Sequence, residues 1–206
     1  MISTTADVKG YVRVRNHDLF PSLADTDLLM LNGPFTTVEG DGSRTLSLVP
    51  PSMIGPPEKI HVDMRDTTTP GIFTGRVGQG TVVWLPWELG ALYYRHSLPA
   101  HAGLFRDCIA QLYPRRQLTT TAHPLVEITL MEQAGHTQIH LINLSGHSQT
   151  AYFPPVAMRE IRLAIRGDFH SARAIRHPMD LKVATRDGYS EIVLPELLDY
   201  ELVVLK

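Results

Sequence analysis

Several features that would point to a particular class of protein are scarce in this sequence. The 206 residues include a single cysteine, Cys108, which excludes an intramolecular disulfide and any zinc or iron–sulfur site built from several cysteines. Basic and acidic side chains nearly cancel, 19 against 21, so no excess of positive charge favours a phosphate backbone or an anionic membrane. We therefore expect neither nucleic acid nor a membrane as a partner.

Targeting segments and the usual short catalytic signatures are missing as well. Residues 1–15 contain no apolar stretch of signal-peptide length, and no run approaches the ~20 apolar residues of a membrane helix. Together with the single cysteine, this favours a cytoplasmic protein. The sequence has no nucleophile elbow, phosphate loop, dinucleotide motif or zinc motif. We expect no cofactor, no metal and no catalytic residue in this chain.

What the sequence does contain is apolar residues in short runs separated by turn formers. Hydrophobic residues make up 43% of the chain, with 15 Gly and 15 Pro, a composition typical of a strand-rich globular protein of one or two domains. We predict an α+β, strand-rich fold in two domains. Residues 1–118 form a partial α/β domain, and residues 119–206 form an antiparallel β-sandwich.

The first domain combines strand patterns with one helix. Strands are predicted at 11–15, 26–32, 45–49 and 59–63, and a hairpin is predicted over 71–85 around Gly78-Gln79-Gly80. The helix begins after an N-cap at Ser97, has Pro99 in its first turn and ends before Pro114. Helical spacing puts its apolar residues on one face, toward the core: Leu104, Phe105, Cys108, Ile109 and Leu112. A buried Cys108 would be unreactive.

The second domain is predicted from seven runs that alternate between apolar and polar residues. Turn residues separate these runs at intervals typical of a sandwich. The predicted strands are 125–130, 137–143, 159–165, 171–175, 180–184, 189–194 and 199–205.

Isolated polar residues give weak signals for chemistry. His61 and Asp63 share one face of a predicted strand, but no third metal ligand accompanies them. Glycoside hydrolysis needs two carboxyl groups at a set separation, and the sequence does not place any two of Glu88, Glu127 and Glu132 at that separation. The sequence Asn143-Leu-Ser145 matches a glycosylation sequon, which we interpret as fortuitous without a secretory signal.

The segment 83–96 is the densest unusual feature, because it holds both tryptophans and two tyrosines of the chain. Trp84 lies within a predicted strand, which favours a place in the core. The segment after it is predicted to be a strand-to-helix loop, where binding groups are often found. Its side chains fit a contact surface and the core equally well, and they are our candidate ligand-binding or interface residues: Trp87, Glu88, Tyr93, Tyr94, Arg95 and His96.

Three runs in and beyond this segment also resemble a known family: GQGTVVWLPWELG (78–90), LYYRH (92–96) and TQIHLINLSG (137–146). They resemble the C-terminal region of glycoside hydrolases that look like β-galactosidases with a trimerisation domain. In that family a catalytic (β/α)8 barrel precedes a flavodoxin-like domain, similar to class I glutamine amidotransferases, and a small β-sandwich. The runs VPP (49–51) and PPE (56–58) look like the segment before the last strand of the middle domain.

The resemblance implies a role without catalysis. The family's catalytic residues lie in the barrel, which needs about 250 residues, so none can be assigned here, and the chain looks like a C-terminal fragment or a reduced relative. A shortened sheet exposes an edge that pairs with a second copy, which predicts a homodimer or trimer, or contact with a catalytic barrel supplied elsewhere.

We therefore expect an accessory or oligomerisation module of a glycoside hydrolase. The alternatives are a stand-alone carbohydrate-binding protein that uses the loop from Trp87 to His96, and a small hydrolase that uses Glu88 and His96.

Overall fold

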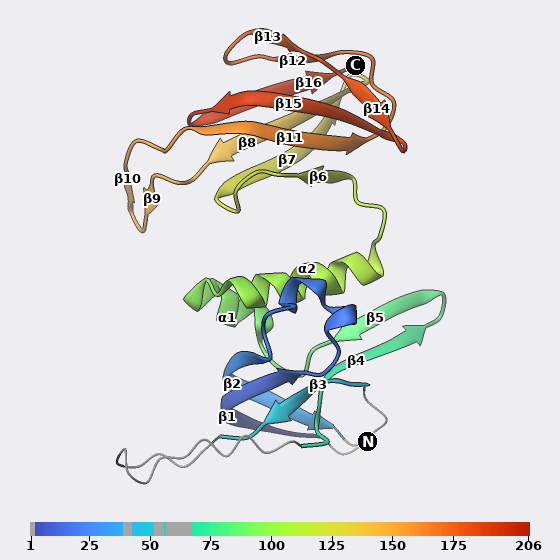
Figure 1. Cartoon of the computed structure of the whole chain (residues 1–206), viewed down its shortest axis with the longest axis vertical. Coiled ribbons are helices and arrows are strands. Elements are labelled where there is room, and N and C mark those ends of the chain that lie inside the picture. The colour runs from blue at the N-terminus through green and yellow to red at the C-terminus, as the bar shows by residue number, and fades with distance from the viewer. Residues whose placement is uncertain (1–2, 39–42, 52–55, 57–66) are drawn as a thin grey trace. The chain divides into compact units, whose positions relative to one another are not determined.

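The computed structural model describes residues 3–38, 43–51, 56 and 67–206 and divides into two compact units, Met1–Arg115 and Arg116–Lys206 (Figure 1). Each unit is described by itself. The expected boundary at residue 118 falls inside a strand of the second unit, Leu118–Thr120. The expected strand at 59–63, with His61 and Asp63, lies outside the described residues.

The first unit contains a five-stranded sheet in the order β2-β1-β3-β4-β5. Two short 3-10 helices, η1 (His17–Leu19) and η2 (Pro21–Leu23), connect its first two strands. Two α-helices, α1 (Leu89–His96) and α2 (Pro99–Leu112), follow its last strand. The strands are β1 (Ser3–Val14), β2 (Leu28–Val38), β3 (Ser43–Val49), β4 (Pro70–Val77) and β5 (Gly80–Trp84).

The strand-rich α+β class is confirmed, but this sheet differs from the expected flavodoxin-like arrangement. A flavodoxin-like sheet has parallel strands joined by helical crossovers. Here the described strands pair antiparallel at every contact. Both α-helices come after β5, so within the described ranges no α-helix supplies the crossover that a parallel pair requires.

The helices lie on one face of the sheet, and the core forms between the two layers (Figure 1). Alternation along β1 turns Val12 and Val14 inward, where both are buried. From α2, Leu104 and Cys108 are buried against the sheet, which confirms the expected burial of the thiol.

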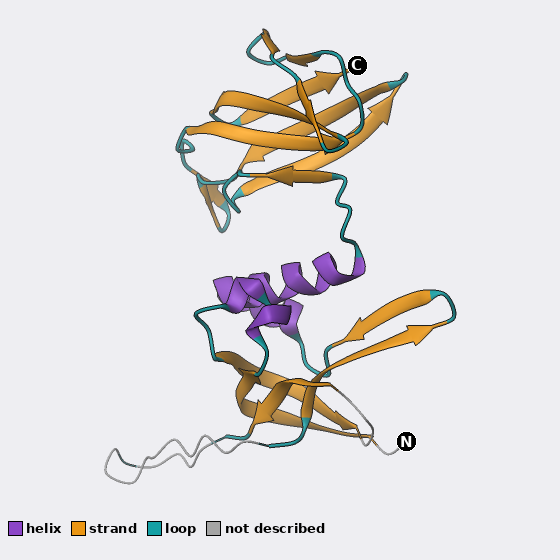
Figure 2. Cartoon of the chain, turned by 45° about the vertical axis from the view of Figure 1, so that its right-hand side comes forward, coloured by secondary structure: helices purple, strands orange, loops and turns teal. Residues whose placement is uncertain are grey.

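The predicted hairpin is confirmed as β4 and β5, which pair from Phe73–Trp84 to Val77–Gly80. Its outer part, residues 74–82, is exposed throughout, and Figure 2 shows it extending beyond the other strands of the sheet. The pairing of β3 with β4 is recorded only at Pro70 and Ile72, so the outer hairpin has no neighbouring strand among the described residues.

The second unit is an antiparallel β-sandwich, as predicted. One sheet has the order β14-β15-β11-β6 and the other β13-β12-β16-β8-β7, and buried aliphatic side chains from both sheets form its core. The strands are β6 (Leu118–Thr120), β7 (Val126–Gln133), β8 (His136–Asn143), β9 (His147–Ser148), β10 (Ala151–Tyr152), β11 (Met158–Arg166), β12 (Ala172–Ala174), β13 (Met179–Leu181), β14 (Ala184–Arg186), β15 (Tyr189–Leu197) and β16 (Tyr200–Leu205).

One buried carboxylate organises a turn of the sandwich. Glu201 on β16 is only 1% exposed, and it accepts the backbone N–H groups of Ile175 at 3.0 Å, Arg176 at 2.8 Å and His177 at 3.1 Å. Although burial alone would raise the pKa of Glu201, these N–H groups, that of Leu202 and the His177 ring together hold it below its ordinary value. The carboxylate therefore stays ionised and fixes the turn after β12.

Candidate interaction surface

The indole of Trp87 is part of the core of the first unit. Its side chain is 5% exposed, and its Nε1 donates a hydrogen bond to the carbonyl of Gly71 at 2.9 Å. The ring meets His101 edge-on with 6.0 Å between centroids, and the backbone forms a bridge with Phe35. Of the two positions that the sequence left open for Trp87, the structure shows the core, where the rest of this chain covers the ring.

Trp84 shows the reverse: it was expected in the core, yet it is 41% exposed. Val83 and Leu85 pack against the core, so period-two alternation turns Trp84 to the opposite side of β5. There its ring packs against that of Phe73 at a tilt, with 5.1 Å between ring centroids. The tryptophan that the sequence favoured for the core is thus the more exposed of the two.

The residues after Trp87 form helix α1 rather than the expected loop. Leu89 and Leu92, three positions apart on one face of the helix, are both buried and hold it against the sheet. Ser97 has a φ of 50° and its N–H bonds to the carbonyl of Tyr93 at 2.7 Å. Ser97 therefore ends α1, and α2 begins after Leu98 with Pro99 as its first residue.

The remaining candidates lie at the surface of α1. The side chain of Glu88, immediately before the helix, lies 3.5 Å from the guanidinium of Arg95. Both side chains are about half exposed, and an exposed ion pair of this kind contributes little to stability. Tyr93 is 41% and Tyr94 89% exposed, and His96 is exposed as well. The structure thus leaves two tyrosine rings available for contact.

Helix α2 and the residue after it add a row of exposed apolar side chains, and the sequence placed three of them, Phe105, Ile109 and Leu112, in the core. Its three helical members lie at positions i, i+4 and i+7, which puts them on one side of the helix, and Tyr113 is the C-cap that follows them. The members are Phe105 (56% exposed), Ile109 (40%), Leu112 (42%) and Tyr113 (47%); we call them the α2 row. Large apolar side chains gathered in this way mark contact sites in soluble proteins. Helical periodicity shows that these residues share one side of α2, but it does not show which side of α2 the sheet covers.

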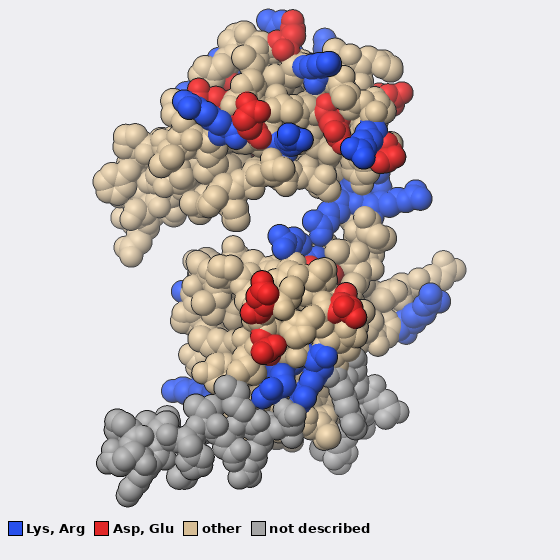
Figure 3. All heavy atoms as spheres, in the orientation of Figure 1, with Lys and Arg blue, Asp and Glu red and all other residues tan. Residues whose placement is uncertain are grey.

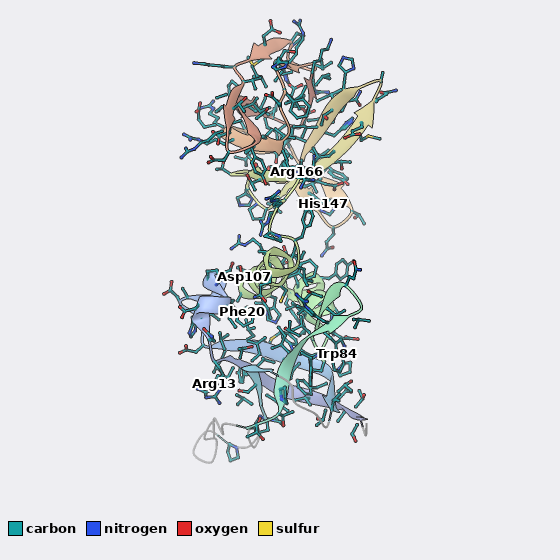
Figure 4. All side chains as sticks on the ribbon, turned by 90° about the vertical axis from the view of Figure 1, so that its right-hand side faces the viewer. Arg13, Phe20, Trp84, Asp107, His147 and Arg166 are labelled. Carbon is teal, nitrogen blue, oxygen red and sulfur yellow. The ribbon has the colours of Figure 1, made fainter. Side chains whose placement is uncertain are left out.

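Polar groups on the inner side of α2 fix its position. Asp107, 6% exposed, accepts the N–H of Ser22 at 2.9 Å and its hydroxyl at 2.5 Å, which joins α2 to η2 (Figure 4). His101 bonds through Nε2 to the carbonyl of Met30 at 2.9 Å. Burial, and to a smaller extent the nearby His96, hold the pKa of His101 below 6.5. The helix is therefore held rigidly, and its outer row is presented in a fixed position.

The described residues offer little for catalysis or metal binding. Burial and the neighbouring Asp107 raise the pKa of Cys108 to about 11, so its thiol stays protonated and unreactive near neutral pH. Among the described side chains, no three His, Cys, Asp or Glu are grouped as metal ligands. No helix in the described part of the chain has the length and apolar character needed to cross a membrane.

Comparison with known proteins relates this fold to glycoside hydrolases. No family model matches the sequence, and no curated protein matches it. Among solved structures, 99% of the chain matches α-L-fucosidase isoenzyme 2 from Paenibacillus thiaminolyticus, with a TM-score of 0.69 and 13% identity. This chain shares its fold with part of a glycoside hydrolase.

Two β-galactosidases match over 98% of the chain, and the second of them is a GH42 enzyme. The enzyme from Bacillus circulans sp. alkalophilus has a TM-score of 0.52 and 9% identity. A catalytic mutant of the enzyme from G. stearothermophilus has a TM-score of 0.51 and 11% identity. The chain spans 33% of the length of the fucosidase and 22–24% of the galactosidases. At such identities the likeness concerns the fold alone.

Proposed function

We propose that this chain is a non-catalytic accessory module of a glycoside hydrolase and that it acts through protein contact. The observation that carries the proposal is how much of this chain, and how little of each glycoside hydrolase, the structural matches cover. Almost the whole chain, 98–99%, matches a third or less of each glycoside hydrolase. A (β/α)8 barrel needs about 250 residues, and the described strands of the two units form antiparallel sheets instead. Catalysis would then belong to a barrel outside this chain.

The α2 row is the proposed contact surface. Aromatic and aliphatic side chains of this size form the centres of protein interfaces, where they become buried against a partner. Because Asp107 and His101 anchor the inner side of α2, the backbone that carries the row is already ordered before a partner covers it. Tyr93 and Tyr94 extend the exposed apolar surface on the preceding helix.

The proposed partner is another copy of this chain, in a dimer or trimer, with a catalytic barrel as the other candidate. The proposal is tested by measuring the molar mass in solution by light scattering across a range of concentrations. We expect a dimer or trimer, and we expect Ile109→Ser to weaken self-association at least tenfold, because it puts a hydroxyl in an apolar contact. Val77→Ser is the matched control, since Val77 is 72% exposed on the outer hairpin, away from α2.

A chain that is monomeric at every concentration would contradict self-association. An equal effect of Ile109→Ser and Val77→Ser would exclude the α2 row as the contact surface. Turnover of aryl glycosides by the chain alone, lost in Glu88→Gln, would instead support the small-hydrolase alternative. The carbohydrate-binding alternative at this segment has lost its strongest stacking residue, because Trp87 is buried.

A further inference from the structure

The connection between β8 and β11 in the second unit exposes a group of large apolar side chains. Tyr152 is 76%, Phe153 64% and Val156 70% exposed. The ring of His147 lies beside that of Tyr152, with centroids 5.1 Å apart. We call residues 144–157 the aromatic loop; its first part is the small β9–β10 hairpin.

The aromatic loop is held in place by a set of hydrogen bonds. The buried Asn143 side chain donates to the carbonyls of Val156 at 2.8 Å and Leu198 at 2.6 Å. The hydroxyl of Ser145 accepts the N–H of Val156 at 2.8 Å. The carbonyl of Gly146 accepts the N–H of Phe153 at 2.8 Å. Both ends of the loop are thus tied to each other.

A glycine is required at the closest approach in this loop. A Cβ at position 146 would collide with the carbonyl oxygen of Phe153, so the two strands of the loop can meet only because Gly146 has no side chain. The aromatic rings are therefore carried on a braced segment, and little conformational freedom is lost when a ligand covers them.

The aromatic loop itself carries no charged side chain. From Gln133 to Met158 the sequence contains no Asp, Glu, Lys or Arg. In Figure 3 the surface over β9 and β10 is uniformly tan, whereas charges of both signs cover other parts of this unit. Ligands recognised through charge, such as phosphates, nucleic acid or acidic sugars, have no partner here. The ligand that fits this surface is neutral.

Uncharged hydrogen-bonding groups accompany the rings. The turn between β9 and β10 exposes the side chains of Ser148, Gln149 and Thr150, next to His147 and the hydroxyl of Tyr152. Aromatic faces with neutral donors and acceptors at their edge match a hexose, which has an apolar C–H face and a rim of hydroxyls. We propose that the aromatic loop binds a neutral saccharide, with a pyranose ring stacked on Tyr152 or Phe153.

This site is independent of the α2 row, so its failure and the failure of the proposed function are distinguishable. The test is electrophoresis of the native chain in gels that contain galactan, galactomannan or β-glucan, with polygalacturonate as the acidic comparison. We expect slower migration in at least one neutral polysaccharide and none in polygalacturonate. At least one of the variants Tyr152→Ala and Phe153→Ala should weaken the apparent affinity about tenfold.

Met131→Ala is the matched control, because Met131 is an apolar residue of the same unit, 52% exposed on β7 and outside the aromatic loop, and it should leave migration unchanged. Thermal unfolding of each variant verifies the fold. The proposal is overturned by normal migration in all three neutral polysaccharides, or by equal retardation of the wild type and both loop variants. A change of molar mass in Tyr152→Ala without any saccharide binding would also overturn it, because the loop would then be a protein contact.

Discussion

Asp107 in the first unit and Glu201 in the second are both buried carboxylates that accept hydrogen bonds from a segment distant in sequence. Asp107 takes two, both from Ser22, and so fixes a helix to a 3-10 turn. Glu201 takes the N–H groups of three consecutive residues, 175–177, and of Leu202. A buried carboxylate therefore joins helix α2 to η2 in the first unit and fixes the turn after β12 in the second unit.

The difference reflects how each unit covers its sheets. In the second unit two sheets cover each other, so polar anchors are needed only where strands change direction. In the first unit a single sheet depends on helices that follow it in sequence, and buried polar groups from α2 and the Trp87 indole attach them. The stability of the first unit therefore depends on the attachment of its helices to the sheet.

Removal of Trp87 should have the largest effect, confined to the first unit. We expect Trp87→Ala to lower the free energy of unfolding by about 3–5 kcal/mol, through the cavity and the lost bond to Gly71. The fluorescence of Trp84 reports this unit, because the second unit has no tryptophan. Urea unfolding followed at Trp84 measures the change, and far-UV circular dichroism shows whether the sandwich persists.

The control for this variant is Trp84→Ala, followed through Trp87, which should cost about 1 kcal/mol or less because Trp84 is half-exposed. Equal losses in the two variants would contradict the assignment of the core to Trp87.

Glu201→Gln should destabilise the second unit by about 2–3 kcal/mol. A glutamine keeps one acceptor oxygen but turns an NH2 group toward N–H donors, which leaves buried groups unpaired. Denaturant unfolding followed by far-UV circular dichroism measures the loss. Glu196→Gln is the matched control on strand β15 of the other sheet, where the pair with Arg159 at 3.4 Å is exposed; we expect less than 1 kcal/mol. A Glu201→Gln chain as stable as the control would exclude the turn-closing role.

Lowering the pH should destabilise the two units over different pH ranges, with a smaller effect than the substitutions above. The pKa of His101 is lowered from 6.5 on folding, so the unfolded state takes up the proton first, and the first unit loses stability as pH falls below 6.5. The pKa of Glu201 is lowered from 4.5, so its contribution is full above 4.5 and is lost only as pH falls toward the folded-state value.

Melting temperatures recorded from pH 7 to pH 4 by tryptophan fluorescence and circular dichroism should therefore decline first for the first unit. His101→Gln should remove that part of the slope. A simultaneous decline of both units above pH 4.5, unchanged in His101→Gln, would contradict the assignment.

The sequence predicted the sandwich better than the first unit, for a physical reason. Its strands alternate apolar and polar residues with turns at each end, so the expected 137–143 and 189–194 correspond closely to β8 and β15. In the first unit, α1 is held by only two buried leucines, Leu89 and Leu92, and such a short pattern has no clear helical period.

The surface residues were the hardest to predict. Periodicity puts Phe105 and Leu104 near one face of α2, but only the packing against the sheet decides that Leu104 is covered and Phe105 is not. The five other candidates between Glu88 and His96 are placed at the surface, yet nothing in the fold tests their role. The aromatic loop was missed, although the absence of charge from Gln133 to Met158 was a readable signal.

Asn143 also has a consequence for producing this protein. Its amide nitrogen is the atom to which a glycan would be attached at the sequon Asn143-Leu-Ser145, and in the fold that nitrogen already donates to two carbonyls. A eukaryotic secretory host that glycosylates the chain before it folds would block the brace of the aromatic loop. Bacterial expression avoids this, whereas removing the sequon by Ser145→Ala would itself delete the acceptor for Val156.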